Sequence, residues 1–146
     1  MHSILVVLHS LNRFILLALL LIVLYHSLKG WLTKSPFEKA DDKLSLFLFI
    51  ATHTQLLLGL ALYFVSPVVV FSGASMKDPV ARYWLVEHLT GMLIAVVLIS
   101  LGRILSKKVS DSTTKHKRLF IYNIVALVVI LAIIAQNHRG FFNVSW

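Results

Sequence analysis

The stretch ILVVLHSLNRFILLALLLIVL, residues 4–24, decides the class of this protein. A single charged side chain, Arg13, interrupts its apolar character. A helix of about 20 apolar residues crosses roughly 30 Å of hydrocarbon, so the stretch predicts a membrane-spanning helix. It is longer than the roughly 7–15 apolar residues of a secretory signal, and no basic segment precedes it, so we expect this helix to be retained.

Three further apolar stretches of similar length follow, at about 46–66, 84–103 and 119–137. The whole chain of 146 residues is 58% hydrophobic and 14% charged, whereas a soluble domain has about 45–50% apolar and about 25% charged residues. Its mean hydropathy is +0.85. This composition excludes a soluble or disordered protein. We predict an all-α, transmembrane four-helix bundle that forms one domain over residues 1–146.

The basic residues predict how the bundle is oriented. Ten of the 14 Lys and Arg lie in or beside the connections 25–45 and 104–118, namely Lys29, Lys34, Lys39, Lys43, Arg103, Lys107, Lys108, Lys115, Lys117 and Arg118. The positive-inside rule then places both connections in the cytoplasm and both termini on the outer, periplasmic side of a bacterial inner membrane. The basic connections could also attract anionic lipid headgroups. No nucleic-acid-binding motif accompanies the net charge of +8, so we expect no nucleic acid as a partner.

The residue inventory excludes several chemistries. The chain has no cysteine, so iron–sulfur ligation, thiol catalysis and cysteine-based zinc sites are excluded. We find no Ser/His/Asp set, metalloprotease helix or Gly-rich phosphate loop, and therefore predict no catalytic residues of the soluble type.

Two histidines inside the spans are the main candidates for a site, because polar groups within hydrocarbon are costly and usually functional. By the helical rise, His9 and His88 both lie about 7 Å to the outer side of the membrane midplane, on different helices. Two imidazoles at one depth are what a haem iron with two axial protein ligands requires. We predict His9 and His88 as metal ligands of haem b. Imidazoles also bind copper or zinc and relay protons, so such a site is an alternative.

Two neighbours of this pair are predicted to contact the cofactor. Arg13 lies one turn from His9 on the same helix face, where it could meet a haem propionate, pair with Glu87, or extend to the interface. Gly91 begins a strip of small side chains next to His88, continued by Ala95, on which a flat ring could rest. The same strip could instead let two helices approach closely.

The remaining histidines are weaker candidates. His53 lies about 12 Å below the first pair, and we keep it as a hydrogen-bonding core residue, a quinone contact or a cofactor ligand. His26 is expected at the inner interface and His116 in a solvated basic run. His138, at the end of the fourth span, is a reserve ligand.

The chain also resembles a family over essentially its whole length. The elements that carry the resemblance are Leu8-His9-Ser10 with Arg13, the run 51–59 (ATHTQLLLG), Tyr63-Phe64-Val65-Ser66-Pro67, Met76-Lys77-Asp78, Trp84-Leu85-Val86-Glu87-His88, and Gly102-Arg103 through Lys115-His116-Lys117. They are similar to the small four-helix bacterial membrane proteins labelled cytochrome B-like. The resemblance implies haem b and electron transfer, with His9, His53 and His88 at the positions of the family's histidines.

Our hypothesis is therefore a membrane b-type cytochrome-like electron carrier or redox subunit, rather than a stand-alone enzyme. It would pass electrons between quinol and a redox partner protein. One alternative is a non-catalytic accessory subunit of a larger membrane complex, and another is the transition-metal or proton-handling site. The apolar surface of a four-span unit would also suit a homo-oligomer.

Overall fold

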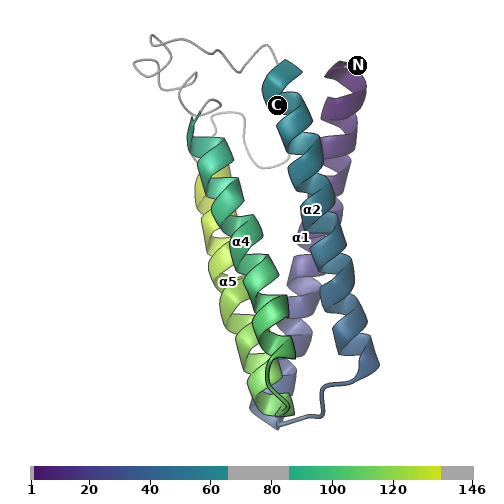
Figure 1. The fold of residues 1–146 in the computed structure, drawn as a ribbon, viewed down its shortest axis with the longest axis vertical. Helices are drawn as coiled ribbons and strands as arrows, with labels where there is room; N and C mark the ends of the chain where they lie inside the picture. The colour runs from purple at the N-terminus through teal and green to yellow at the C-terminus, as the bar shows by residue number, and fades with distance from the viewer. Residues whose placement is uncertain (1, 66–85, 136–146) are drawn as a thin grey trace.

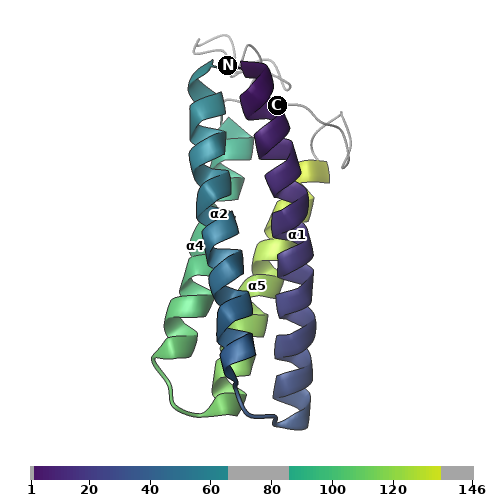
Figure 2. The same cartoon turned by 90° about the vertical axis from the view of Figure 1, so that its right-hand side faces the viewer.

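The structure, a computed structural model, describes residues 2–65 and 86–135. These residues form four α-helices and no strand: α1 (His2–Thr33), α2 (Lys39–Val65), α4 (His88–Lys107) and α5 (Ser112–Ala135). All four are long and apolar enough to cross a membrane. The prediction of an all-α protein with four helices is confirmed for the described residues, and each helix could cross a membrane. The helices lie side by side, and consecutive ones run in opposite directions (Figures 1 and 2).

The helices extend further than the predicted spans at the end of the bundle that carries the basic connections. Most of 25–45 and 104–118 is helical, which leaves short connections at residues 34–38 and 108–111. Hydropathy marks the part of a helix that fits into hydrocarbon, but backbone hydrogen bonds continue through polar residues beyond it. The helix ends could therefore not be read from the apolar stretches.

The bundle consists of two helix pairs, α1 with α2 and α4 with α5 (Figure 1). Large apolar side chains such as Leu20 and Leu48 are fully buried between the pairs, while many others, such as Leu57 and Phe64, are exposed on the outside. An exposed apolar exterior suits lipid rather than water as the surrounding solvent. Polar side chains are also buried among the described residues, His9, Thr52 and Asn123 among them.

Gly91 and Gly102 allow α4 to approach α5 closely. A Cβ atom at Gly91 would collide with the side chain of Ile133, and one at Gly102 would lie 3.1 Å from Cβ of Tyr122. Gly91 therefore serves helix packing, the second of the two roles that the sequence left open, whereas Ala95 of the same strip lines the pocket between the helices.

Polar contacts close the basic end of the bundle. Nη1 of Arg118 donates to the Leu105 carbonyl at 2.9 Å, and Nζ of Lys115 donates to the Ser106 carbonyl at 3.0 Å. These two cations satisfy carbonyls at the C-terminus of α4, where the helix dipole also favours positive charge. Arg103 reaches the other helix pair, with Nη1 3.2 Å from Oδ1 of Asp42 on α2. These contacts join α5 to α4, and α4 to α2, at this end of the bundle.

Candidate functional site

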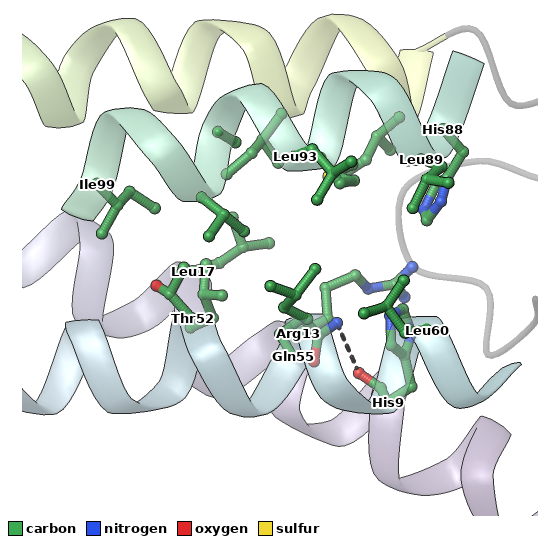
Figure 3. Close-up of a pocket in the computed structure, with 18 residues that line it drawn as sticks. His9, Arg13, Leu17, Thr52, Gln55, Leu60, His88, Leu89, Leu93 and Ile99 are labelled. Atoms are coloured by element: carbon green, nitrogen blue, oxygen red, sulfur yellow. Dashed lines mark hydrogen bonds between the residues drawn. The ribbon is translucent and has the colours of Figure 1, made fainter. Parts of the chain in front are cut away.

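His9 of α1 and His88 of α4 face each other across the bundle (Figure 3). Their ring centroids are 6.5 Å apart, and the ring planes are inclined at 53°. His9 is buried and His88 partly buried. The two residues are 79 positions apart in the sequence, and they meet because both stand at the same level of adjoining helix pairs. The structure thus brings together the two histidines that the helical rise placed at one depth.

A pocket extends from this histidine pair along the bundle, between the two helix pairs. Its 18 lining residues are mostly apolar and come from all four helices, as Leu16, Leu56, Met92 and Ile134 illustrate. The line that joins the two imidazoles crosses the space between the pairs, while the apolar lining follows that space lengthwise (Figure 3). The site is therefore a slot, with one imidazole on each of its two walls near one end.

Arg13 supplies the basic side chain of the pocket. It lines the wall formed by α1 and extends toward the two imidazoles (Figure 3). Its guanidinium carbon lies 4.8 Å from the centroid of the Phe14 ring, which supports the cation from its own helix. The structure thus places Arg13 beside the histidine pair, as the helix-face argument predicted.

A chain of amide hydrogen bonds holds α1 against α2 at the level of His9. Nε2 of Gln55 donates to the His9 carbonyl at 3.0 Å, the bond drawn in Figure 3. Nδ2 of Asn12 donates to Oε1 of Gln55 at 2.8 Å and to the Ala51 carbonyl at 3.0 Å. This role of Asn12 and Gln55 was not predicted from the sequence. Both amides lie within apolar spans, and a buried amide requires hydrogen-bond partners, so their position could have indicated this role.

Gly59 lies beside the ring of His9. A Cβ atom at position 59 would stand 3.3 Å from Nε2 of His9, closer than an ordinary van der Waals contact. The missing side chain therefore leaves room at this ring nitrogen. Gly59 also lines the pocket. Gly59 was not predicted to belong to the site, because a glycine within a helix can serve several different roles.

His53 and Gly91 are not part of the pocket lining. Nδ1 of His53 is hydrogen-bonded to the Phe49 carbonyl of its own helix at 2.8 Å, and its ring lies 4.2 Å from the Phe49 ring. Of the three interpretations of His53, the hydrogen-bonding one describes this geometry. Gly91 faces α5, because the rotation of α4 about its axis is set by packing against Ile133. His138 lies outside the described residues.

His116 differs from its expected position in a solvated run. It is only 2% exposed, its ring lies 5.1 Å from that of Phe37, and a Cβ atom at Gly30 would lie 2.5 Å from the imidazole. The reason is the length of α1, which continues to Thr33 and covers this face of α5. Neither ring nitrogen of His116 has a hydrogen-bond partner among the described residues.

The pocket has few side chains that could bind a metal ion. Within residues 2–65 and 86–135, no group of three or more histidine, aspartate or glutamate side chains is arranged to hold a metal ion. The histidine pair alone can supply two nitrogen ligands from opposite walls. No protein-family model, curated protein or solved structure matches the chain.

Proposed function

We propose that this protein binds haem b between His9 and His88 and takes part in membrane electron transfer. The observation that carries the proposal is the separation of 6.5 Å between the two imidazole centroids across the slot. An imidazole nitrogen binds a metal ion at about 2.0 Å, so two rings that bind one ion from opposite sides have their centroids roughly 6 Å apart. The two histidines thus stand at the spacing that bis-imidazole ligation needs.

The shape of the slot supports a planar cofactor. His9 and His88 would hold a flat macrocycle from the two walls, and the apolar side chains that line the space between the helix pairs would surround it. Gly59 is consistent with this arrangement, because it leaves room beside Nε2 of His9. The histidine pair and the apolar lining of the slot therefore support haem b as its ligand.

The number of protein ligands distinguishes haem from a bare metal ion. A structural zinc site has four protein ligands, and a catalytic zinc site has three. The described residues offer no such group. A haem iron already has four nitrogen ligands from its macrocycle and needs only two from the protein. The pair His9 and His88 meets that smaller requirement.

The protein would contribute binding, orientation and a low dielectric, while haem supplies one-electron chemistry when it is bound. Arg13 provides a positive charge at the slot, suited to a propionate carboxylate. Gln55 holds the backbone of His9 in place through the His9 carbonyl. The apolar side chains exclude water, which strengthens these electrostatic interactions.

The wider function follows from this cofactor and from the fold. We propose an electron carrier or redox subunit that exchanges electrons with quinol and with a redox partner protein, related to the cytochrome B-like family. The apolar exterior would also serve contacts in a homo-oligomer or a larger membrane complex. The basic connections support an orientation with residues 34–38 and 108–111 in the cytoplasm of a bacterium and both termini outside.

The test is the reduced-minus-oxidised absorption spectrum of protein that has been purified after expression with sufficient haem. We expect the bands of a b-type cytochrome and iron at one atom per chain, both lost in the His9→Ala and His88→Ala variants. His53→Ala is the matched control, because His53 is another histidine of the spans but does not line the slot. It should keep the spectrum.

The other outcomes contradict the proposal in distinct ways. Absence of b-type bands together with stable co-purification of larger membrane proteins would favour an accessory subunit. Copper or zinc without iron would favour a metal site on the same histidines. Equal loss of haem in the His53→Ala variant would place the ligands elsewhere.

The orientation has a separate test, which uses the absence of natural cysteines. Ser110→Cys and Ser3→Cys place single thiols at exposed positions on opposite ends of the bundle. We expect a membrane-impermeant maleimide to label the first only in inverted vesicles and the second only in intact cells. The reverse pattern would overturn the orientation and leave the haem site untouched.

A further inference from the structure

A groove between α4 and α5 at the basic end carries an inference that does not depend on haem. Its six lining residues are Leu105, Thr114, Lys117, Arg118, Ile121 and Tyr122. The cations stand at the end of the groove near the start of α5, and the apolar residues Leu105 and Ile121 continue from them along the helices. Cationic and apolar groups thus occur in the order in which a phospholipid presents its headgroup and its acyl chains.

The groove lies at the depth in the membrane that a lipid headgroup occupies. It lies at the last turn of α4 and the first turns of α5, where both apolar helices end. Nζ of Lys117 lies 5.9 Å from the ring centroid of Trp31, which belongs to α1. Tryptophan favours the membrane–water interface, so the ammonium group is placed at headgroup depth.

The charge of Lys117 and Arg118 is not neutralised within the described parts of the chain. Neither lies within 4.0 Å of a described carboxylate, whereas Arg103 and Lys107 both approach Asp42. Arg118 is held in the groove by a hydrogen bond from its Nη1 to the Leu105 carbonyl, which is a neutral acceptor. Its guanidinium group keeps further donors, in the planar arrangement that binds phosphate.

Thr114 does not add to this anion site. Its hydroxyl donates to Oδ2 of Asp111 at 2.7 Å, and its backbone N–H donates to the same oxygen at 3.0 Å. An anion would therefore be bound by Lys117 and Arg118 alone. Acyl chains would be bound by the apolar part of the groove.

We propose that this groove binds an anionic phospholipid of the surrounding leaflet, with its phosphate at Lys117 and Arg118 and its acyl chains along Leu105 and Ile121. Basic pockets between transmembrane helices bind anionic headgroups in this way. The lipid binds as part of the bilayer, through its acyl chains as well as its phosphate. A free phosphate ion lacks the contacts of the acyl chains.

The experiment is a lipid titration of the purified full chain in detergent, followed by native mass spectrometry. The probes are phosphatidylglycerol and the zwitterionic phosphatidylcholine. We expect phosphatidylglycerol to bind in preference. Each basic residue near an anionic lipid contributes about a fivefold change in affinity, so Lys117→Gln with Arg118→Gln should weaken binding about 30-fold.

The matched control is the double variant Lys39→Gln with Lys43→Gln, which removes two exposed charges of α2 at the same end of the bundle. It should bind phosphatidylglycerol like the wild type. An equal loss in this control would mean diffuse attraction, and would overturn the proposal. So would equal binding of the two lipids, or displacement of phosphatidylglycerol by millimolar inorganic phosphate.

Because Arg118 also bonds to α4, circular dichroism and thermal unfolding should accompany the titration. If the double variant does not fold, Lys117→Gln alone decides the matter, since Lys117 is exposed and makes no hydrogen bond within the described residues. It should weaken phosphatidylglycerol binding about fivefold. An unchanged affinity would refute the groove as the site.

Discussion

Gly59→Ala is the sharpest perturbation of the proposed haem site, because it separates cofactor binding from stability. The new methyl group would stand 3.3 Å from Nε2 of His9. His9 would have to move by a few tenths of an ångström, in a site whose ligands must be held within about 0.5 Å. Changes next to a metal ligand typically lower metal affinity about 10- to 100-fold. We expect a loss of haem affinity near the lower end of this range.

Stability should not fall in parallel with affinity. Alanine is favoured over glycine in a helix interior by roughly 1 kcal/mol, which offsets the cost of moving His9. The assay is a haem titration of the apoprotein, followed by the absorption of the bound haem, together with thermal unfolding of the apoprotein. Gly59→Val, with its larger side chain, should lose more haem affinity than Gly59→Ala.

Gly102→Ala is the matched control. Its Cβ atom would stand 3.1 Å from Cβ of Tyr122, in the contact of α4 with α5 and outside the pocket lining. This variant should unfold at a lower temperature than the wild type but bind haem with unchanged affinity. Normal haem affinity in the Gly59→Ala variant, or an equal loss in the Gly102→Ala variant, would refute the assignment of His9 as a ligand held beside Gly59.

Three further perturbations test the packing around the site and at the basic end. Gly30→Ala should destabilise the bundle by about 1–3 kcal/mol, because its Cβ atom would lie 2.5 Å from the ring of His116. Thermal unfolding should show partial recovery when His116→Ala is added, and no recovery would contradict this contact. Gln55→Leu should lower the free energy of unfolding by about 1 kcal/mol, since it breaks the amide chain. A double-mutant cycle with Asn12→Leu that gave no coupling energy would exclude that chain. The hydrogen bond from the Thr114 hydroxyl lowers the pKa of Asp111. The ionised carboxylate therefore stabilises the N-terminus of α5 at pH values above the ordinary carboxyl range, and this stabilisation is lost as the pH falls through the lowered pKa. Amide exchange of the first turn of α5, corrected for intrinsic rates, should therefore rise in acid in the wild type and be independent of pH in Asp111→Ala.

The sequence predicts the parts of this molecule that depend on one helix at a time. The membrane thickness fixes the length of an apolar stretch, so the four helices follow from hydropathy. The rise per residue fixes depth, so His9 and His88 could be placed at one level before any contact was known. Their approach to 6.5 Å agrees with that depth argument.

The features that the sequence leaves open depend on how two helices meet. Gly91 lies three residues after His88, yet it faces α5, because the rotation of α4 is set by its packing against Ile133. His116 is buried because α1 extends far enough to cover it, and helix length beyond the hydrocarbon leaves no hydropathy signal. Hydropathy and helical rise describe neither property.

The contacts at the basic end of the bundle bear on the geometry of the slot. At the basic end the helix pairs are joined by polar contacts: the backbone N–H of Phe37 donates to Oγ of Ser112 at 3.0 Å, and Arg103 contacts Asp42. Short connections on the same side limit how far the helices of each pair can separate. His9 and His88 line the slot near the opposite end of the bundle. A rigid basic end can thus hold the two walls at a fixed distance, and a site that needs two ligands at one spacing benefits from that rigidity.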